Sequence, residues 1–306
     1  MPQKRKGRKL TGIFLLDKKK GLTSNKALQQ IKQLFEAEKA GHTGSLDPLA
    51  TGVLPICFGQ ATKFSRFLLD AEKSYETIIE LGVTTESGDA EGKVIQKKPV
   101  YHLNVECIES ALKLYRGKIQ QIPSMFSALK VDGERLYKLA RKGITIDRDP
   151  RNIEIRELKL LSFSGNEAKL FIRCSKGTYV RTLVEDIGES IGCGAHVREL
   201  RRLQVASLSI RDCFTFESIR DLRQKNEFLD AKLLSVGSAL SGLSKVFVSE
   251  NSEIRLRHGK TICFECSAPL GLVAMYVKNS KREGEFLGIG EFLSNGCLSP
   301  KKMLAN

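Results

Sequence analysis

The chain has 306 residues, of which 41% are hydrophobic, so it can bury one large core together with a smaller one. Its 50 lysine and arginine residues outnumber 35 acidic ones, and the formal charge of +15 indicates a polyanionic partner such as nucleic acid. The sequence lacks an apolar stretch as long as a signal-peptide core or a membrane span, so we expect a cytoplasmic protein without membrane contact.

The N-terminal part of the sequence predicts a basic arm, a strand and a helix. Positive charges crowd the first ten residues, which is typical of a disordered arm that gains contacts on nucleic acid: Lys4, Arg5, Lys6, Arg8 and Lys9. An apolar run over residues 11–17 predicts a buried strand, and the lysine-rich turn after it ends at Gly21. Either Thr23 or Ser24 then caps a helix whose apolar residues recur at helical spacing through Phe35.

A loop over residues 41–52 carries the main candidate for a catalytic residue. It reads Gly-His-Thr-Gly-Ser-Leu-Asp-Pro-Leu-Ala-Thr-Gly, a composition that fits neither a helix nor a central strand. Pro48 fixes the backbone directly after Asp47, and His42 lies a few residues before it. A carboxylate on a rigid turn suits a covalent nucleophile. The spacing fits equally well an Asx-turn that only stabilises the loop.

The remaining elements alternate between helices and strands. We expect a helix after the loop through about residue 70, a strand over 74–83 and a helix over 105–116. Two strands over 153–163 and 168–174 flank a Gly165-Asn166 turn, and a helix follows over 180–191. Beyond a weakly patterned connection, short strand-like runs predict a small β-rich module: 245–249, 260–264, 271–277 and 286–292.

A second candidate group lies in residues 174–183, which read Cys-Ser-Lys-Gly-Thr-Tyr-Val-Arg-Thr-Leu. Tyr179 and Arg181 alternate along this stretch, so in an extended conformation both side chains face the same site. An arginine beside Asp47 would form a bidentate pair and keep the carboxylate ionised. An ordinary surface salt bridge is the alternative interpretation.

Several other chemistries lack their motifs. The sequence has no phosphate-binding Gly-x-x-x-x-Gly-Lys-Ser/Thr loop, no dinucleotide-binding Gly-x-Gly-x-x-Gly and no Gly-x-Ser-x-Gly elbow. Its eight cysteines are scattered singly except for Cys263 and Cys266, which is typical of reduced core thiols. Because His258 is nearby but nothing completes a set of four ligands, we expect no metal site.

The loop motif resembles that of the TruB family of tRNA pseudouridine synthases. Residues 17–24, 174–183 and 192–202 resemble further blocks of the same family, with Lys19 at a position where the family usually has proline. The resemblance implies the α+β pseudouridine synthase fold, with a mixed, largely antiparallel sheet and flanking helices. It also implies a C-terminal PUA-like, RNA-binding domain. We expect an arm over residues 1–10, a catalytic domain over 11–243 and the PUA-like domain over 244–306.

The resemblance also assigns roles to single residues. It implies that Asp47 is the nucleophile, that Arg181 pairs with it, and that Tyr75 stacks on the target base and hydrogen-bonds or shuttles a proton. Four residues are expected to bind the substrate beside Tyr75: Lys18, His42, Tyr179 and Leu200. Three arginines next to Leu200 are predicted phosphate contacts: Arg198, Arg201 and Arg202.

The implied reaction is the isomerisation of uridine 55 in the T arm of tRNA. The base must be flipped out, and His42 is placed to fill the vacated space. Asp47 then attacks either C1′ of the ribose or C6 of the base, the uracil rotates and rejoins through C5, and Tyr75 is a candidate base for the C5 proton. We expect no cofactor, no obligate protein partner and a monomer. A non-catalytic tRNA-binding or tRNA-folding chaperone and a guide-dependent enzyme are the alternatives.

Overall fold

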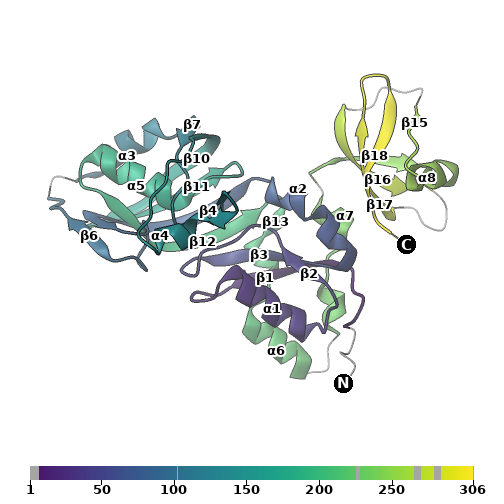
Figure 1. Cartoon of the computed structure of the whole chain (residues 1–306), viewed down its shortest axis with the longest axis horizontal. Coiled ribbons are helices and arrows are strands. Elements are labelled where there is room, and N and C mark those ends of the chain that lie inside the picture. Colours follow the sequence, from purple (N-terminus) through teal and green to yellow (C-terminus); the bar gives the residue numbers. More distant parts are fainter. Residues whose placement is uncertain are drawn as a thin grey trace.

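Two β-sheets with flanking helices form the molecule, as Figure 1 shows. The computed structural model describes residues 7–101, 103–224, 228–240, 242–264, 270–278 and 284–305. Within these ranges, one sheet of nine strands occupies the first two thirds of the chain, and one sheet of five strands lies near the C-terminus. The prediction of an α+β fold with a β-rich C-terminal module is therefore confirmed.

The large sheet runs in the order β1-β3-β12-β4-β11-β10-β7, with β2 paired to β3 and β13 paired to β12. All of its pairings are antiparallel except that of β12 with β3, so the sheet is mixed and largely antiparallel, as predicted. Its strands are β1 (Gly12–Lys18), β2 (Ala40–His42), β3 (Thr51–Phe58), β4 (Lys73–Leu81), β7 (Gly117–Gln121), β10 (Arg151–Ser164), β11 (Glu167–Cys174), β12 (Ala195–Val205) and β13 (Leu208–Ser209). Two small hairpins pair β5 (Val83–Thr85) with β6 (Val94–Lys97) and β8 (Lys130–Val131) with β9 (Glu134–Arg135).

The helices begin and end at residues whose side chains or backbone suit helix termini. The side chains of Thr23 and Asn104 accept hydrogen bonds from backbone N–H groups in the first turns of α1 and α3, and left-handed Gly192 ends α5. The helices are α1 (Ser24–Leu34), α2 (Ser65–Leu69), α3 (Val105–Leu114), α4 (Leu136–Ala140), α5 (Val180–Ile191), α6 (Phe216–Gln224), α7 (Val236–Ala239) and α8 (Glu250–Arg257). Short 3-10 turns cover Gly59–Phe64, Ile210–Asp212 and Leu229–Lys232.

The main core lies between one face of the large sheet and helices α1, α3, α5 and α6. It includes Phe14, Ile31, Ile79, Leu112 and Ile187, each at most 1% exposed. On the opposite face, β1 packs against α7, and α7 and the Gly59–Phe64 turn contact β17 of the C-terminal sheet. The two sheets are thus joined by an apolar contact that buries side chains from both.

That contact includes the aromatic pair Phe64 and Phe286, whose ring centroids are 5.6 Å apart. The C-terminal sheet runs in the order β14-β16-β17-β18-β15 and has its own core around Leu256, Met275 and Leu287. Its strands are β14 (Ser244–Val248), β15 (Ile262–Cys263), β16 (Gly271–Val277), β17 (Phe286–Phe292) and β18 (Cys297–Met303). The sequence predicted the first four of these strands but neither β18 nor helix α8.

Two predictions for the N-terminal third are wrong. Residues 51–58 form strand β3 between β1 and β12, and helical structure begins only at Gly59. The run is buried on both sides, and a continuous apolar stretch of this length does not distinguish a strand from a helix. Arg8 is also not part of a free arm, because its backbone bonds to Glu36 and Glu38 and its side chain pairs with Asp230.

Candidate active site

Asp47 lies in a loop, as the sequence predicted, and this loop joins β2 to β3. Both neighbours of Asp47 are fixed by residues 21–24. The Ser24 hydroxyl accepts a hydrogen bond from Leu46 N at 2.8 Å and donates one to Leu46 O at 3.0 Å. Gly21 N donates to Pro48 O at 2.8 Å. These bonds hold the loop on either side of the carboxylate, which explains why two separate sequence motifs occur together.

Lys18 supports the same loop from the protein interior and is not exposed at the site. It is fully buried, and its ammonium donates to Leu22 O at 2.7 Å, Lys19 O at 3.1 Å and Pro48 O at 3.4 Å. Burial lowers the pKa of Lys18 to about 8, although the negative charge of Asp47 acts against this. The structure thus places Lys18 where its ammonium holds the backbone of the loop, away from the position expected of a substrate contact.

Arg181 pairs with Asp47 across the site. Its Nε lies 2.9 Å from Asp47 Oδ2, and its two terminal nitrogens donate to Ser87 O and Phe126 O, both at 2.8 Å. The predicted pairing is confirmed, but it is not bidentate, because the backbone carbonyls occupy the other nitrogens. The side chain of Arg181 is 6% exposed, so this is not an ordinary surface salt bridge.

The prediction that Tyr179 and Arg181 alternate along an extended stretch is wrong. Arg181 lies in the first turn of α5, and Tyr179 is the residue before that helix, so the two do not alternate along a strand. Gln121 fixes Tyr179 instead, since its amide donates to Tyr179 O at 3.1 Å and accepts from Tyr179 N at 2.8 Å. The helix start therefore places Arg181 at the site, while Tyr179 borders it.

Opposing effects set the protonation of Asp47. Its side chain is 40% exposed, but protein surrounds it on the other sides, and this burial raises the pKa of the carboxyl. The positive charge of Arg181 lowers that pKa, and the negative charge of Asp89 raises it. Because burial has the largest effect, Arg181 limits the rise rather than holding the pKa below its usual range, as the sequence had led us to expect.

Asp89 is a site residue that the sequence analysis missed. It is 4% exposed, and its Oδ2 lies 3.7 Å from Arg181 Nε. Its Oδ1 accepts hydrogen bonds from Ser87 Oγ at 2.6 Å and Glu91 N at 3.1 Å. The only local signal is a Ser-Gly-Asp turn, which is equally typical of an ordinary loop.

Tyr75 lies on β4 and is 8% exposed. Burial raises the pKa of its hydroxyl to about 12, although the positive charge of Arg202 lowers it in part. The phenol therefore keeps its proton at neutral pH, which argues against Tyr75 as the base for the C5 proton. Its ring and neutral hydroxyl remain suited to contact with a base.

Arg202 has a structural role and not the predicted phosphate contact. It is 1% exposed, and it donates to Val53 O at 2.7 Å and Gly44 O at 3.2 Å, which ties together both ends of the catalytic loop. Gly52, with φ of +105°, permits this arrangement, because a Cβ there would lie 2.1 Å from Arg202 O. Arg201 remains half-exposed but pairs with Asp17 at 2.6 Å.

His42 and Leu200, the two further residues expected to bind the substrate, both lie next to the Asp47 loop. His42 ends β2, and its buried Nδ1 has no hydrogen-bond partner among the described residues. Burial and the positive charge of Arg202 lower the pKa of His42, so the ring is neutral near pH 7. Leu200 is 8% exposed, and its carbonyl accepts a hydrogen bond from Thr51 Oγ1 at 3.5 Å.

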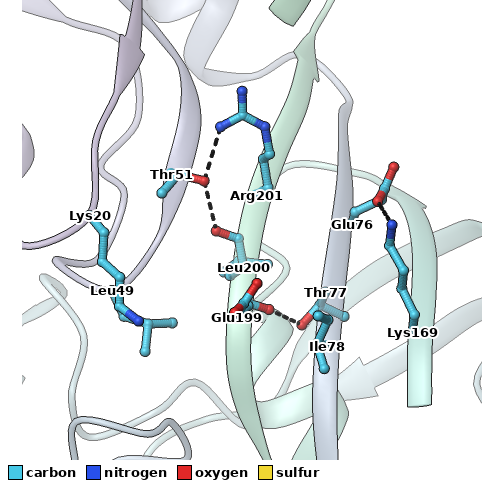
Figure 2. Close-up of a pocket in the computed structure, with 10 residues that line it drawn as sticks. All are labelled: Lys20, Leu49, Thr51, Glu76, Thr77, Ile78, Lys169, Glu199, Leu200 and Arg201. Carbon is cyan, nitrogen blue, oxygen red and sulfur yellow. Dashed lines mark hydrogen bonds and ion pairs between the residues drawn. The ribbon is translucent and has the colours of Figure 1, made fainter. Parts of the chain in front are cut away.

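A groove of about 340 Å³ lies beside the loop, and Figure 2 shows its lining. Glu76 and Lys169 form an ion pair of 2.5 Å along one wall. Glu76 and Arg201 face the side of the sheet opposite to Tyr75 and Arg202, whereas Leu49 follows Asp47 by two residues, so the groove adjoins the Asp47 site. The lining consists of Lys20, Leu49, Thr51, Glu76, Thr77, Ile78, Lys169, Glu199, Leu200 and Arg201.

Comparison with known proteins gives the family. The model for the N-terminal domain of TruB family pseudouridylate synthases matches residues 32–180. The model for the tRNA pseudouridylate synthase B C-terminal domain matches residues 181–241, and that for the pseudouridine synthase II TruB C-terminal region matches residues 244–304. The chain belongs to the TruB family. It is thus a pseudouridine synthase, which is an isomerase.

Individual TruB relatives align along nearly the whole chain. A tRNA pseudouridine synthase B of Stutzerimonas stutzeri is 49% identical over 98% of both chains, and one of Pseudomonas aeruginosa is 46% identical over the same shares. Among solved structures, a chain of an H/ACA RNP bound to a substrate RNA superposes with a TM-score of 0.74 at 21% identity, covering 97% of this chain and 86% of that one. A Cbf5-Nop10-Gar1 complex gives the same TM-score at 23% identity, over 96% and 84%. At such identities the structures establish the fold alone.

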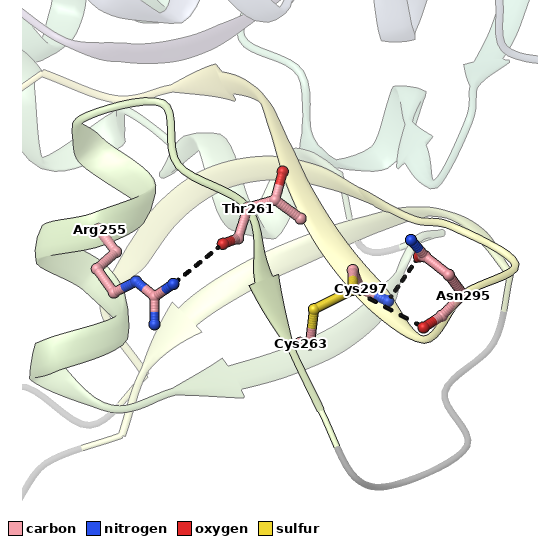
Figure 3. The surroundings of a disulfide bond; sticks show 5 residues. All are labelled: Arg255, Thr261, Cys263, Asn295 and Cys297. Atoms are coloured by element: carbon pink, nitrogen blue, oxygen red, sulfur yellow. Dashed lines mark hydrogen bonds between the residues drawn. A yellow bond between two sulfur atoms is a disulfide. The ribbon is translucent and has the colours of Figure 1, made fainter.

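The cysteines of this TruB protein correct one further prediction. Cys263 and Cys297 form a disulfide, shown in Figure 3, whereas we expected all cysteines to be reduced. The two residues are direct partners in the register of β15 and β18, with Cα atoms 4.0 Å apart. Sequence spacing does not reveal such a register. Cys266 lies outside the described residues.

Metal clusters and membrane-spanning helices are both absent from the described residues. In those parts of the chain, no group of three or more histidine, cysteine, aspartate or glutamate residues could hold a metal ion. Within the same residues, no helix has the length and apolar character needed to cross a membrane.

Proposed function

We propose that this protein converts uridine 55 in the T loop of tRNA to pseudouridine, with Asp47 as the nucleophile. The contact between Arg181 Nε and Asp47 Oδ2 at 2.9 Å carries this proposal, because it gives a partly exposed carboxylate a fixed direction and a charge partner. Relatives named tRNA pseudouridine synthase B that are 46–49% identical over 98% of both chains support tRNA as the substrate.

Substrate entry requires that the uridine leave the folded T loop. Unstacking the base costs about a few kcal/mol of free energy, and contacts with the protein must offset that cost. The neutral ring of His42 can fill the vacated space without introducing a charge. Tyr75, Tyr179 and Leu200 then supply aromatic and apolar surface around the extruded base, and the net charge of +15 attracts the RNA.

The chemistry is an isomerisation in which atoms and electrons balance without a cofactor. Asp47 attacks C1′ or C6 and forms a covalent bond, the C1′–N1 bond breaks, and the uracil turns. A C1′–C5 bond then forms and the bond to Asp47 breaks, while C5 loses its proton to a base and N1 takes up a proton from solvent. Asp47 is the better candidate for that base once it is free again, because its pKa is raised whereas Tyr75 keeps its own proton.

The proposed enzyme has two domains and a basic N-terminal segment. The catalytic domain spans residues 11–243 and an RNA-binding domain spans 244–306, which agrees with the family boundary between 241 and 244 and with a separate core in the second part. Residues 1–10 add basic charge. We propose that the enzyme works in the cytoplasm as a monomer, without a guide RNA or protein partner.

The test uses purified protein and a T-arm transcript labelled with tritium at C5 of uridine, without guide RNA or cofactor. We expect tritium release from the transcript with uridine 55 and none from a matched transcript in which that uridine is cytidine, labelled at its other uridines. Equal release from both transcripts would contradict the assigned position. Tight binding without release would favour the tRNA-folding role instead.

A further inference from the structure

Glu185 is a largely enclosed carboxylate that the mechanism above does not use. It lies four residues after Arg181 on α5, so both side chains occupy the same side of the helix. Its carboxylate packs directly on Gly88, since a Cβ built on Gly88 would lie only 2.5 Å from Glu185 Oε1. Gly88 has φ of +73°, so the turn and the close approach both suit glycine.

The turn beneath Glu185 is the one that holds Arg181. Ser87 O accepts a hydrogen bond from Arg181 Nη1 at 2.8 Å, and Asp89 Oδ2 lies 3.7 Å from Arg181 Nε. Glu185 therefore contacts Gly88, the middle residue of the turn. The outer residues Ser87 and Asp89 both face the guanidinium of Arg181. The turn is in this way enclosed between the Arg181 and Glu185 side chains of one helix.

We propose that Glu185 is a positioning residue: its carboxylate braces the Ser87–Asp89 turn and attracts the Arg181 guanidinium, and so fixes Arg181 against Asp47. This inference rests on the proposed function of Asp47. Glu185 acts through Arg181 and does not contact the substrate. The electrostatic part of the brace operates only while Glu185 is ionised.

The surroundings of Glu185 place its titration near neutral pH. Burial raises its pKa to about 7, and the positive charge of Arg181 lowers it in part. The other charged groups that act on it are Asp186 on the same helix, Asp89 on the turn, and Arg148 from the segment before β10. Above pH 7 Glu185 is thus charged and attracts Arg181, whereas below pH 7 it is neutral and this attraction is lost.

The experiment compares Glu185→Gln with the wild type in single-turnover pseudouridine formation between pH 6 and 8.5. The matched control is Glu189→Gln, an exposed carboxylate on the same helix that is not among the charges acting on Glu185. We expect equal rates at pH 6 and a rate about fivefold lower for Glu185→Gln at pH 8, below the roughly hundredfold cost of a 1 Å misplacement. Glu189→Gln should follow the wild type throughout, and tRNA affinity should not change.

A second variant guards against a folding defect. Glu185→Asp keeps the charge but shortens the side chain, so it should restore the pH-dependent part of the rate while leaving a smaller, pH-independent loss. A constant ratio between wild type and Glu185→Gln at all pH values, or the same pH-dependent loss in Glu189→Gln, would overturn the inference. Absence of turnover by the wild type would instead refute the proposed function, so the two failures are distinguishable.

Discussion

The catalytic carboxylate is held by two regions that work in different ways. Residues 18–24 fix the loop around Asp47 with hydrogen bonds to the backbone, made by Lys18, Gly21 and Ser24. Helix α5 and the Ser87–Asp89 turn instead surround the carboxylate with charges. The comparison suggests that one region determines where Asp47 lies and the other determines how readily it is ionised.

The largest effect should come from the region that supplies charge. Arg181→Lys keeps one positive charge but loses the fork that reaches Asp47, Ser87 O and Phe126 O together. We expect the single-turnover rate to fall about a hundredfold or more. Arg156→Lys, a half-exposed arginine paired with Glu72 and Glu154, is the matched control and should leave the rate unchanged. Equal losses in both variants would show that the site geometry of Arg181 is irrelevant.

A smaller effect is expected in the region that fixes position. Ser24→Ala removes both hydrogen bonds to Leu46 and leaves two buried backbone groups unpaired, at a cost of about 1–3 kcal/mol in unfolding free energy. The rate should fall about tenfold because the loop then shifts. Thr23→Ala provides the control: it removes the α1 cap and costs about 1 kcal/mol, but it should not alter the rate. Parallel rate losses in both would mean that helix stability, not loop anchoring, matters.

The subtlest test concerns the pH profile. Asp47 must be ionised to attack, and its pKa is raised, so the wild-type rate should fall as the pH drops through that pKa. Asp89→Asn removes a negative charge that raises the pKa of Asp47, and the acidic limb should therefore move to lower pH. The rate at high pH should change less than in Arg181→Lys. A shift toward higher pH would contradict the assigned direction of the Asp89 effect.

The sequence predicted the features that depend on residues close together in the chain. Helix α5 spans residues 180–191 as predicted, and the composition of residues 41–52 predicted the loop that carries Asp47. These features depend on glycine, proline and apolar spacing within a short stretch of chain, whereas the pairing of Asp47 with Arg181 was implied only by the family resemblance. The position of Asp47 was therefore predictable even though its pKa was not.

Features that depend on contacts between distant segments were not predictable. Strand β3 was expected to be a helix, because its apolar run fits either element. Only its position between β1 and β12 shows that it is a strand. The burial of Lys18, the place of Asp89 beside Arg181, and the Cys263–Cys297 disulfide all arise from the register of segments far apart in the sequence. A lysine run or a Ser-Gly-Asp turn looks the same whether it faces solvent or an active site.

The most direct test of the account is tritium release by Asp47→Asn in a single turnover, with tRNA affinity and thermal stability measured on the same preparation. Asparagine keeps the shape of the side chain but removes the nucleophilic carboxylate. We predict that the variant folds and binds tRNA as the wild type does but releases no tritium. Release at the wild-type rate would contradict the central claim that Asp47 is the catalytic carboxylate.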